Sequence, residues 1–286
     1  MNTISTAVAS KEFHSPLHLR PDAGYETAMM RGLPCIVQDF EGIDLAGVVE
    51  TKARLLFRVE SKYLMTAGEC RQLIGMMSDS YMVMEVHNTR MGGYRTCYYD
   101  DSTFTTYLQH HNGKANRYKL RLRHYESSGE TYLEVKKKTN KGSTEKWRIE
   151  TSWPPAGLTV EEEEFLEMVF PYDHHRFNPV LTTTYERLTL VSKEFPERVT
   201  FDTGISFGNG QQNISYPGIV ICEIKREKGL RTTPAQSAIR SMGLQERAFS
   251  KYCTGVSLLY DRLKHNRFKP NLRLLSRLST GGNPAC

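Results

Sequence analysis

Basic and apolar side chains alternate along the segment Arg117–Lys138. It reads R-Y-K-L-R-L-R-H-Y, then a polar turn around Ser127-Ser128-Gly129, then T-Y-L-E-V-K-K-K. Because successive side chains of a strand point to opposite faces, this spacing predicts a β-hairpin with one charged face and one largely apolar face. The charged positions are Arg117, Lys119, Arg121, Arg123, Glu134, Lys136 and Lys138.

The same alternation recurs in five further segments of the chain. For any single strand it is explained by an antiparallel sheet with one solvated face. For the whole set we expect instead a closed sheet of about eight strands with its charged faces inward, wide enough for a small ligand. The charged or polar positions of these segments are Arg58, Glu60, Lys62, Lys146, Arg148, Glu150, Tyr185, Arg187, Arg198, Glu223 and Lys225.

An inward set of arginines and lysines would repel one another unless a polyanion lay among them. Inward glutamates would need a cation, and Mg²⁺ or Mn²⁺ is commonly bound by one or two carboxylates plus substrate phosphates. The pattern therefore indicates a site for a triphosphate and a divalent metal.

The net charge of the 286-residue chain agrees with an anionic partner. Between Lys114 and Glu150 eleven Lys or Arg stand against five Glu, an excess equal to the formal charge of +6 of the whole chain. Such a local excess favours phosphate, nucleic acid or a membrane surface. No Walker-type phosphate loop or kinase signature occurs, which excludes those ATP sites.

Cysteines and hydropathy favour a cytoplasmic protein. The six cysteines form no C-x-x-C pair, so we expect free thiols. No signal-like segment and no run of about 18 apolar residues occurs. The adjacent histidines His110 and His111 make a poor metal-ligand pair, because adjacent side chains on a helix diverge. We expect His174 and His175 at the surface.

Helices are expected between the charged strands. Thr66 and Glu69 have capping-box spacing at the start of one helix, and Thr159 precedes an acidic first turn of another. The segment 234–260 should be mainly helical, with breaks near Gly243 and Gly255. We divide the chain into a partly helical N-terminal extension (1–50), a tunnel domain (51–262) and a basic C-terminal tail (263–286).

The motifs, in order, resemble those of the VTC domain, the polyphosphate polymerase domain of the vacuolar transporter chaperone complex. This domain belongs to the triphosphate tunnel metalloenzymes, related to the CYTH phosphatases. The resemblance covers residues 54–260. The matching motifs are R-V-E-S-K-Y, Y-Y-D, L-R-L-R-H-Y, L-E-V-K, K-W-R, T-Y-E-R, R-V-T-F-D-T, C-E-I-K and F-S-K-Y.

The resemblance implies an α+β fold: a closed antiparallel β-barrel tunnel of about eight strands, helices packed outside and a C-terminal helix closing one end. It implies an ATP-dependent polyphosphate polymerase with Mn²⁺ or Mg²⁺. Catalytic roles would fall to Arg121, Arg123, Lys136, Arg187, Arg198 and Lys251, substrate binding to Lys62, Lys119, Lys146, Arg148, Tyr185 and Ser250, and metal binding to Glu223, Glu60 and Glu134.

ATP and inorganic polyphosphate are the expected partners, with no nucleic acid; a membrane-protein partner encoded elsewhere stays open. One alternative is a tripolyphosphatase or nucleoside triphosphatase, in which Glu60 or Glu134 would orient water. Arg58 stands where CYTH phosphatases carry a glutamate, which weakens that alternative. The other is a non-enzymatic polyphosphate- or RNA-binding module, which the mostly aliphatic alternating residues disfavour.

Overall fold

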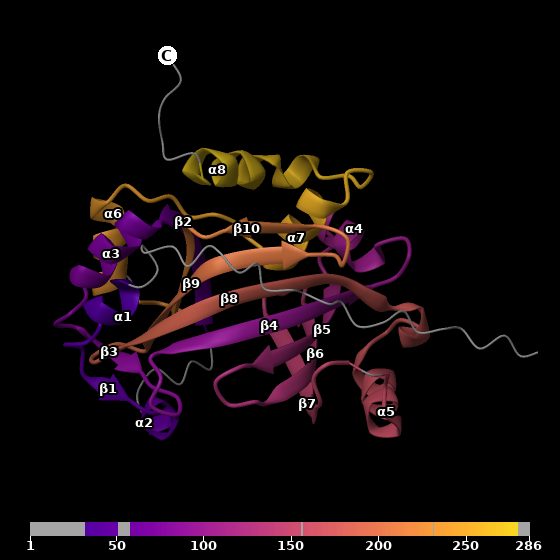
Figure 1. Ribbon diagram of the computed structural model, residues 1–286, viewed down its shortest axis with the longest axis horizontal. Helices are drawn as coiled ribbons and strands as arrows, with labels where there is room; N and C mark the ends of the chain where they lie inside the picture. The colour runs from indigo at the N-terminus through magenta and orange to yellow at the C-terminus, as the bar shows by residue number, and fades with distance from the viewer. Residues whose placement is uncertain (1–31, 51–57, 156, 231, 280–286) are drawn as a thin grey trace, which may run out of the picture.

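The computed structural model describes residues 32–50, 58–155, 157–230 and 232–279, so most of the expected N-terminal extension lies outside the described residues. The fold is α+β, with an eleven-stranded, mostly antiparallel sheet (Figure 1). The strands of its main path, in spatial order, are β2 (Arg58–Thr66), β11 (Ile219–Glu227), β9 (Glu197–Gly208), β8 (Asn178–Ser192), β4 (Met91–Asp100), β5 (Arg117–Tyr125), β6 (Thr131–Lys138) and β7 (Thr144–Thr151).

Three short strands pair with the sheet outside this main path. Strand β3 (Tyr81–Met84) pairs with β8, and β1 (Gly42–Ile43) pairs with β3 in parallel. Strand β10 (Asn213–Tyr216) pairs with β9. The hydrogen-bonded path is open in the described part of the chain: it ends at β2 and β7, which are not neighbours in the sheet order. The expected closure of the barrel by hydrogen bonds is therefore not observed.

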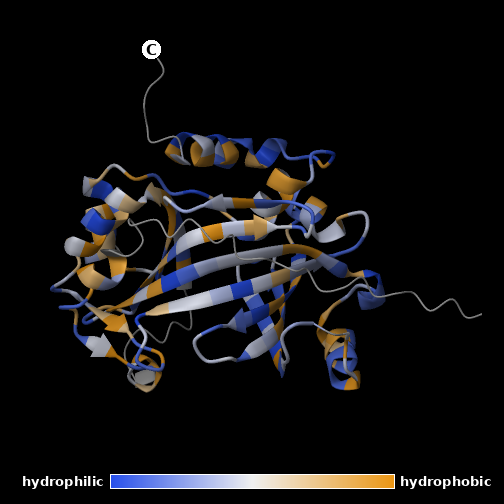
Figure 2. Cartoon of the chain, viewed as in Figure 1, coloured by the Kyte–Doolittle hydropathy of each residue, from blue (hydrophilic) through white to orange (hydrophobic). Residues whose placement is uncertain are grey.

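The hairpin β5–β6 has the predicted register. Leu120 lies opposite Val135 and Arg121 opposite Glu134, so apolar and charged residues occupy opposite faces. Leu120, Leu122, Leu133 and Val135 are buried beneath helix α5 (Val160–Val169), which contributes Phe165 and Leu166. The prediction that these apolar residues form an outer wall covered by a helix is confirmed. Figure 2 shows hydrophilic and hydrophobic residues interleaved along the long strands.

The other half of the sheet is covered on the same outer face. Residues such as Met65, Phe201 and Cys222 pack there against three helices, which Figure 1 shows gathered at one end of the molecule. These helices are α1 (Gly32–Ile36), α3 (Ala67–Gly75) and α6 (Pro234–Ser241). The predicted capping box of Thr66 and Glu69 begins α3, and Thr159 forms another with Glu162 at the start of α5.

The inner face changes character along its length. At one end it is apolar, with Leu181, Phe207 and Ile221 buried against α7 (Lys251–Leu259). Helix α8 (Lys269–Ser279), which Figure 1 shows above β10 and α7, adds Leu275 to this cluster. Helix α7 thus occupies one end of the sheet's interior. The remaining helical segments are α2 (Leu45–Glu50), α4 (Thr105–His111), η1 (His174–Arg176) and η2 (Asn266–Phe268).

Gly255 does not break the C-terminal helical segment, contrary to expectation, because it lies inside α7 where the helix meets the sheet. A Cβ added there would lie 2.6 Å from Leu181 Cδ2 and 2.7 Å from Phe207 Cδ1. Both neighbours are fully buried. The glycine therefore permits a close approach of α7 to β8 and β9. The expected break near Gly243 is found, since α6 ends at Ser241 and α7 begins at Lys251.

Replacing Gly255 by valine should destabilise the fold by about 1–3 kcal/mol, because overpacking forces side chains and backbone to shift. Equilibrium denaturation with urea measures this change. Gly75→Ala is the matched control, since an added Cβ at Gly75 meets nothing within 4 Å. An equal loss in both variants would mean that Gly255 is not a close-packing position.

None of the helices in the described segments is long and apolar enough to cross a membrane.

Candidate functional site

The inner face beside α7 carries the predicted charged residues. On the β5–β7 side, Glu134 is fully buried and lies opposite both Arg121 and Arg148 in the ladders. Arg121 Nε donates to Glu134 Oε2 at 2.7 Å, and Lys146 forms an ion pair with the other carboxylate oxygen. Burial alone would raise the pKa of Glu134, but the neighbouring cations outweigh it and lower the pKa to about 2. Glu134 thus fixes two cations in place.

A second buried carboxylate, that of Asp202 on β9, also holds two cations in place. Arg187 donates through Nε and Nη2 to its two oxygens at 2.5 and 2.8 Å, and Lys251 pairs with Asp202 as well. Burial would raise the pKa of Asp202, yet Arg187 and Lys251 lower it to about 2. The sequence interpretation did not include Asp202 in the site, although it shares the strand face of Arg198 by alternation.

Glu223 lies on β11 between a lysine of the neighbouring strand β2 and a lysine of its own strand. Its ladder partner on β2 is Lys62, and Lys225 Nζ lies 3.6 Å from its carboxylate. Against the effect of burial, Lys62, Lys225 and Arg187 lower the pKa of Glu223, so this group is ionised at neutral pH. Glu60 is its diagonal neighbour on the same face, since Glu60 pairs with Lys225.

The two halves of the sheet face each other across the interior. Glu60 on β2 interacts electrostatically with Lys136 on β6, and Lys62 with Lys119 on β5. The segment before α7 connects the halves: Lys62 Nζ donates to the Phe249 carbonyl at 3.3 Å, and Lys119 Nζ to Ser250 Oγ at 2.8 Å. Side chains and the start of α7 therefore link strands that no backbone ladder joins.

The environment of the Tyr98 phenol indicates the sign of the electrostatic potential in the interior of the sheet. The side chain of Tyr98 is buried, which alone would raise the pKa of the phenol, but Arg121, Arg123 and Lys119 together lower it below the ordinary value. A phenol whose ionisation is favoured despite burial lies in a strongly positive potential. The interior is thus cationic even with Glu134, Asp202 and Glu223 inside it.

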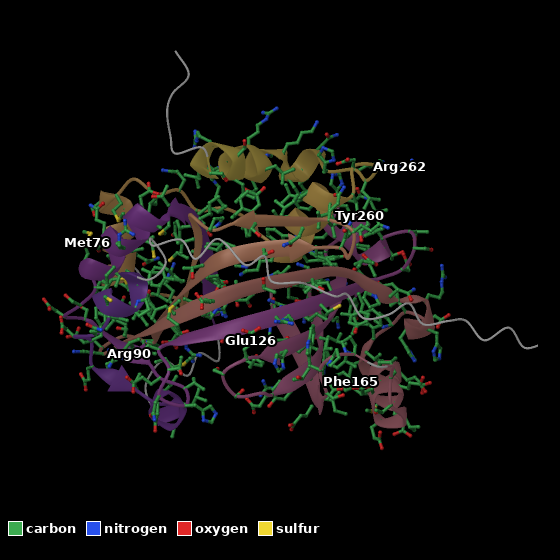
Figure 3. The ribbon with its side chains drawn as sticks, viewed as in Figure 1. Met76, Arg90, Glu126, Phe165, Tyr260 and Arg262 are labelled. Atoms are coloured by element: carbon green, nitrogen blue, oxygen red, sulfur yellow. The ribbon has the colours of Figure 1, made fainter. Side chains whose placement is uncertain are left out.

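At the end opposite α7 the interior opens into a cavity of about 490 Å³. The arginines Arg148, Arg187 and Arg198 line it together with Tyr94 and Tyr132. Tyr94 stacks on Tyr185 at 5.1 Å, and Arg187 lies 5.0 Å from the Tyr94 ring centroid. Arg90, labelled in Figure 3, also lines this cavity. A volume of this size accommodates a nucleotide-sized ligand.

Three buried hydroxyl groups on the inner face lack hydrogen-bond partners in the part of the chain that the structure describes. They are Thr183 Oγ1, Tyr185 Oη and Thr200 Oγ1, each less than 4% exposed. Buried hydroxyls are normally hydrogen-bonded, so unpartnered ones indicate a place for water or ligand oxygens. Cations together with free donors favour an anion with many oxygen acceptors.

The predicted site residues occupy this interior with differing exposure. Lys62, Lys119, Arg121, Arg123, Lys136, Arg187, Arg198, Ser250 and Lys251 are partly buried, Glu134 and Tyr185 are fully buried, and Lys146 and Arg148 are exposed. The exposed pair lies on β7, at the free edge of the sheet path. Ser250 also caps α7 by accepting from the Cys253 backbone N–H at 3.3 Å.

The glutamates predicted to bind a divalent metal differ in how strongly neighbouring cations already engage them. Glu134 is engaged by Arg121 and Lys146 at short range, whereas the carboxylate of Glu223 is ionised, partly buried and 3.6 Å from Lys225 Nζ. Mg²⁺ and Mn²⁺ are often held by one or two carboxylates plus substrate phosphates. Glu223, with Glu60 diagonal to it, fits that chemistry better than Glu134.

Lys136 is the residue through which we expect the affinity of the interior for anions to depend on pH. Burial lowers the pKa of its ammonium group to about 7, with Arg121 and Lys62 adding to the shift against the opposing effect of Glu60. Above that pH a bound polyanion must draw a proton onto Lys136. We therefore expect ATP affinity to fall from about pH 7.5 to about 9, by up to roughly tenfold per unit.

Titration calorimetry with a non-hydrolysable ATP analogue across this range measures the slope. Lys136→Arg is the control, because an arginine stays charged and should flatten the profile. A slope that Lys136→Arg leaves unchanged would assign the pH dependence to another group.

Comparison with known proteins gives one family and several similar folds. The family model described as VTC domain matches residues 57–260. No curated protein sequence matches the chain. Similar solved structures include a protein proposed to be an adenylate cyclase from Vibrio parahaemolyticus, with 16% identity, a TM-score of 0.41 and coverage of 71% of this chain and 99% of that one.

Two further structures have comparable scores. One, from Bacillus halodurans, is likewise proposed to be an adenylate cyclase, with 14% identity, a TM-score of 0.44 and coverage of 71% of this chain and 97% of that one. The other, from Hippeastrum, is proposed to be an adenylyl cyclase and described with a dominant triphosphatase activity. It has 12% identity, a TM-score of 0.42 and coverage of 70% and 96%.

Proposed function

The chain belongs to the VTC domain family, and we propose that it is a metal-dependent polyphosphate polymerase. It would transfer the terminal phosphoryl group of ATP to a growing polyphosphate chain within the charged interior. The observation that carries this proposal is the convergence of cations from both halves of the sheet on one interior. Lys62 on β2 and Lys119 on β5 both donate to the segment before α7, and Lys251 at the start of α7 pairs with Asp202 on β9. A polyphosphate chain is the kind of ligand that such an interior neutralises.

Phosphoryl transfer requires positioning and charge stabilisation more than covalent chemistry. Arg123 would bind phosphoryl oxygens through the two parallel hydrogen bonds of its guanidinium. Arg121 and Arg187, held by Glu134 and Asp202, would bind them through their remaining N–H groups. A divalent cation held by Glu223, with Glu60 beside it, would neutralise charge on the triphosphate. The remaining positioning residues would be Lys62, Lys119, Lys136, Lys146, Arg148, Tyr185, Arg198, Ser250 and Lys251.

The acceptor in this reaction needs no general base, because the terminal phosphate of the chain is already an anion. Hydrolysis would need a carboxylate that orients and deprotonates water. Glu134 is poorly suited to that role, since its pKa of about 2 makes it a weak base and two cations occupy it. Hydrolysis would therefore have to rely on Glu60, the other carboxylate considered for that role, which is partly buried and interacts with Lys136. Transfer to phosphate requires neither carboxylate, so we propose transfer rather than hydrolysis.

The start of α7 closes the interior on one side, and the cavity with Arg148, Arg187 and Arg198 lies on the other. A product that grows by one phosphate per cycle needs an open mouth through which to leave. We assign that role to the cavity. The gap between β2 and β7 would be bridged by side chains rather than by backbone hydrogen bonds. The electrostatic interaction of Glu60 on β2 with Lys136 on β6 is one such contact.

Product analysis tests the proposal. The purified chain is incubated with ATP and Mn²⁺, and the products are resolved by gel electrophoresis while free phosphate is quantified in parallel. We expect phosphate chains longer than triphosphate. Free phosphate alone would identify a triphosphatase, and ligand binding without any turnover would identify a binding module; either result refutes the polymerase.

A further inference from the structure

Three side chains of types that ligate metals lie close together outside the charged interior, where α5 meets η1. One ligand atom from each of Glu163, His174 and His175 lies within 4.8 Å of the other two. Glu163 comes from the first turn of α5, and the histidines begin η1. Within the described residues no other group of three His, Cys, Asp or Glu side chains comes as close.

His174 is the unusual member of this group. Its side chain is only 7% exposed, and its Nε2 has no hydrogen-bond partner among the described residues. The expectation that both histidines lie at the surface is thus wrong for His174. Polar atoms of buried side chains are normally paired. An unpaired nitrogen on an imidazole that also contributes a ligand atom to this group therefore points to a ligand.

The turn that holds the two histidines is fixed on both sides. Phe170 packs against Phe177 at 4.9 Å between ring centroids, and the Phe177 backbone N–H donates to the His174 carbonyl at 2.9 Å. Asp173 accepts from the His175 backbone N–H at 3.2 Å. The rings of His174 and His175 lie 4.2 Å apart. Ligands on a braced turn are positioned before a metal arrives.

We propose that Glu163, His174 and His175 bind one transition-metal dication of the Zn²⁺ class. Two imidazoles and one carboxylate form a recurrent zinc ligand set, whereas Mg²⁺ and Ca²⁺ prefer oxygen ligands. Tetrahedral coordination at about 2.1 Å places ligand atoms about 3.4 Å apart, so modest side-chain rotation completes the site. His175 is exposed and Glu163 partly exposed, which gives the ion access from solvent.

The ion would join α5 to η1. Helix α5 holds Phe165, labelled in Figure 3, against the outer wall formed by Leu120 and Val135. A bound metal should therefore stabilise the cover of the hairpin whose other face carries Arg121 and Arg123. This site is separate from Glu223 and does not depend on the proposed polymerase activity.

Zinc titration of the full, metal-stripped chain tests the proposal. Isothermal calorimetry with Zn²⁺ alone should show a site that His175→Ala and Glu163→Gln each weaken more than about 100-fold, beyond the loss typical of an outer-sphere partner. Both changes are at accessible side chains, so the variants should fold. Co²⁺ added to the parent should give the visible absorption of a tetrahedral site, and His175→Ala should lose it.

Glu223→Gln and His87→Ala are the controls. The first removes the interior carboxylate, the second an unrelated exposed histidine, and both should retain the Zn²⁺ site. Saturating Zn²⁺ should also raise the thermal midpoint of the parent but not of His175→Ala. The proposal is overturned if the parent binds no Zn²⁺, or if His175→Ala and Glu163→Gln bind it as tightly as the parent does.

Discussion

Replacing Arg123 by alanine is expected to lower turnover by roughly 10³-fold or more, the range seen when a charge-stabilising arginine is removed from a phosphoryl-transfer site. Arg123 lies on the inner face of β5. Its hydrogen bond to Thr96 Oγ1 is long, 3.4 Å, so its donors are available to a phosphate. Steady-state ATP consumption at saturating substrate, with ATP binding measured separately, gives the change in both quantities.

Lys137→Ala is the matched control for Arg123→Ala. Lys137 belongs to the same hairpin but to its outer face, where its Nζ pairs with Glu145 at 3.1 Å. Its loss should leave turnover within about twofold, because a surface ion pair contributes little. Arg123→Lys should fall between the two, since an ammonium cannot donate two parallel bonds. Equal losses in Arg123→Ala and Lys137→Ala would show that the assignment of the faces to function is wrong.

The faces themselves could be predicted from sequence because they depend on local geometry. Alternation along β5 and β6 requires only that the segment is extended, and the polar turn fixes where the chain reverses. The burial of Leu120 and Val135 under α5 follows from that alternation. The capping box of Thr66 and Glu69 was predictable for the same reason, since its residues are neighbours in the chain.

Asp202 shows where local pattern stops being informative. Its role depends on the register of β9 against β8, which shifts between Thr184 and Glu186, and on the arrival of Lys251 from α7. Neither the register of β9 against β8 nor the contact with Lys251 can be predicted from the residues adjacent to Asp202 in the sequence. The alternation placed Asp202 on the face of Arg198, but only the fold shows that it fixes Arg187 and Lys251.

Long-range packing also explains the other errors. Gly255 suggests a helix break when taken alone, yet it permits contact with Leu181, which is 74 positions earlier in the chain. His174 resembles a surface residue until η1 folds against α5. The open ladder between β2 and β7 likewise depends on the curvature of the whole sheet, which no single strand determines.

Replacing Glu223 by glutamine is expected to lower turnover by at least about 100-fold while ATP still binds. Glutamine keeps the size of the side chain but removes the charge that would hold a divalent cation. Half-saturation with Mn²⁺ should shift to a higher concentration in the variant. Glu227→Gln, on the same strand and face but at its exposed end, should leave both turnover and the Mn²⁺ requirement unchanged.

The two possible roles of Glu223 predict different combinations of effects. If Glu223 only neutralised Lys62 and Lys225, its replacement would make the interior more cationic, tighten ATP binding and leave the response to Mn²⁺ unchanged. If it holds the metal, ATP binding in the absence of metal should tighten for the same electrostatic reason, while turnover falls and the Mn²⁺ requirement rises. Turnover across a Mn²⁺ series separates the two, whereas ATP affinity without metal should tighten in both cases and only verifies that a negative charge has been removed from the interior. Tighter binding with full turnover would therefore exclude Glu223 as a metal ligand.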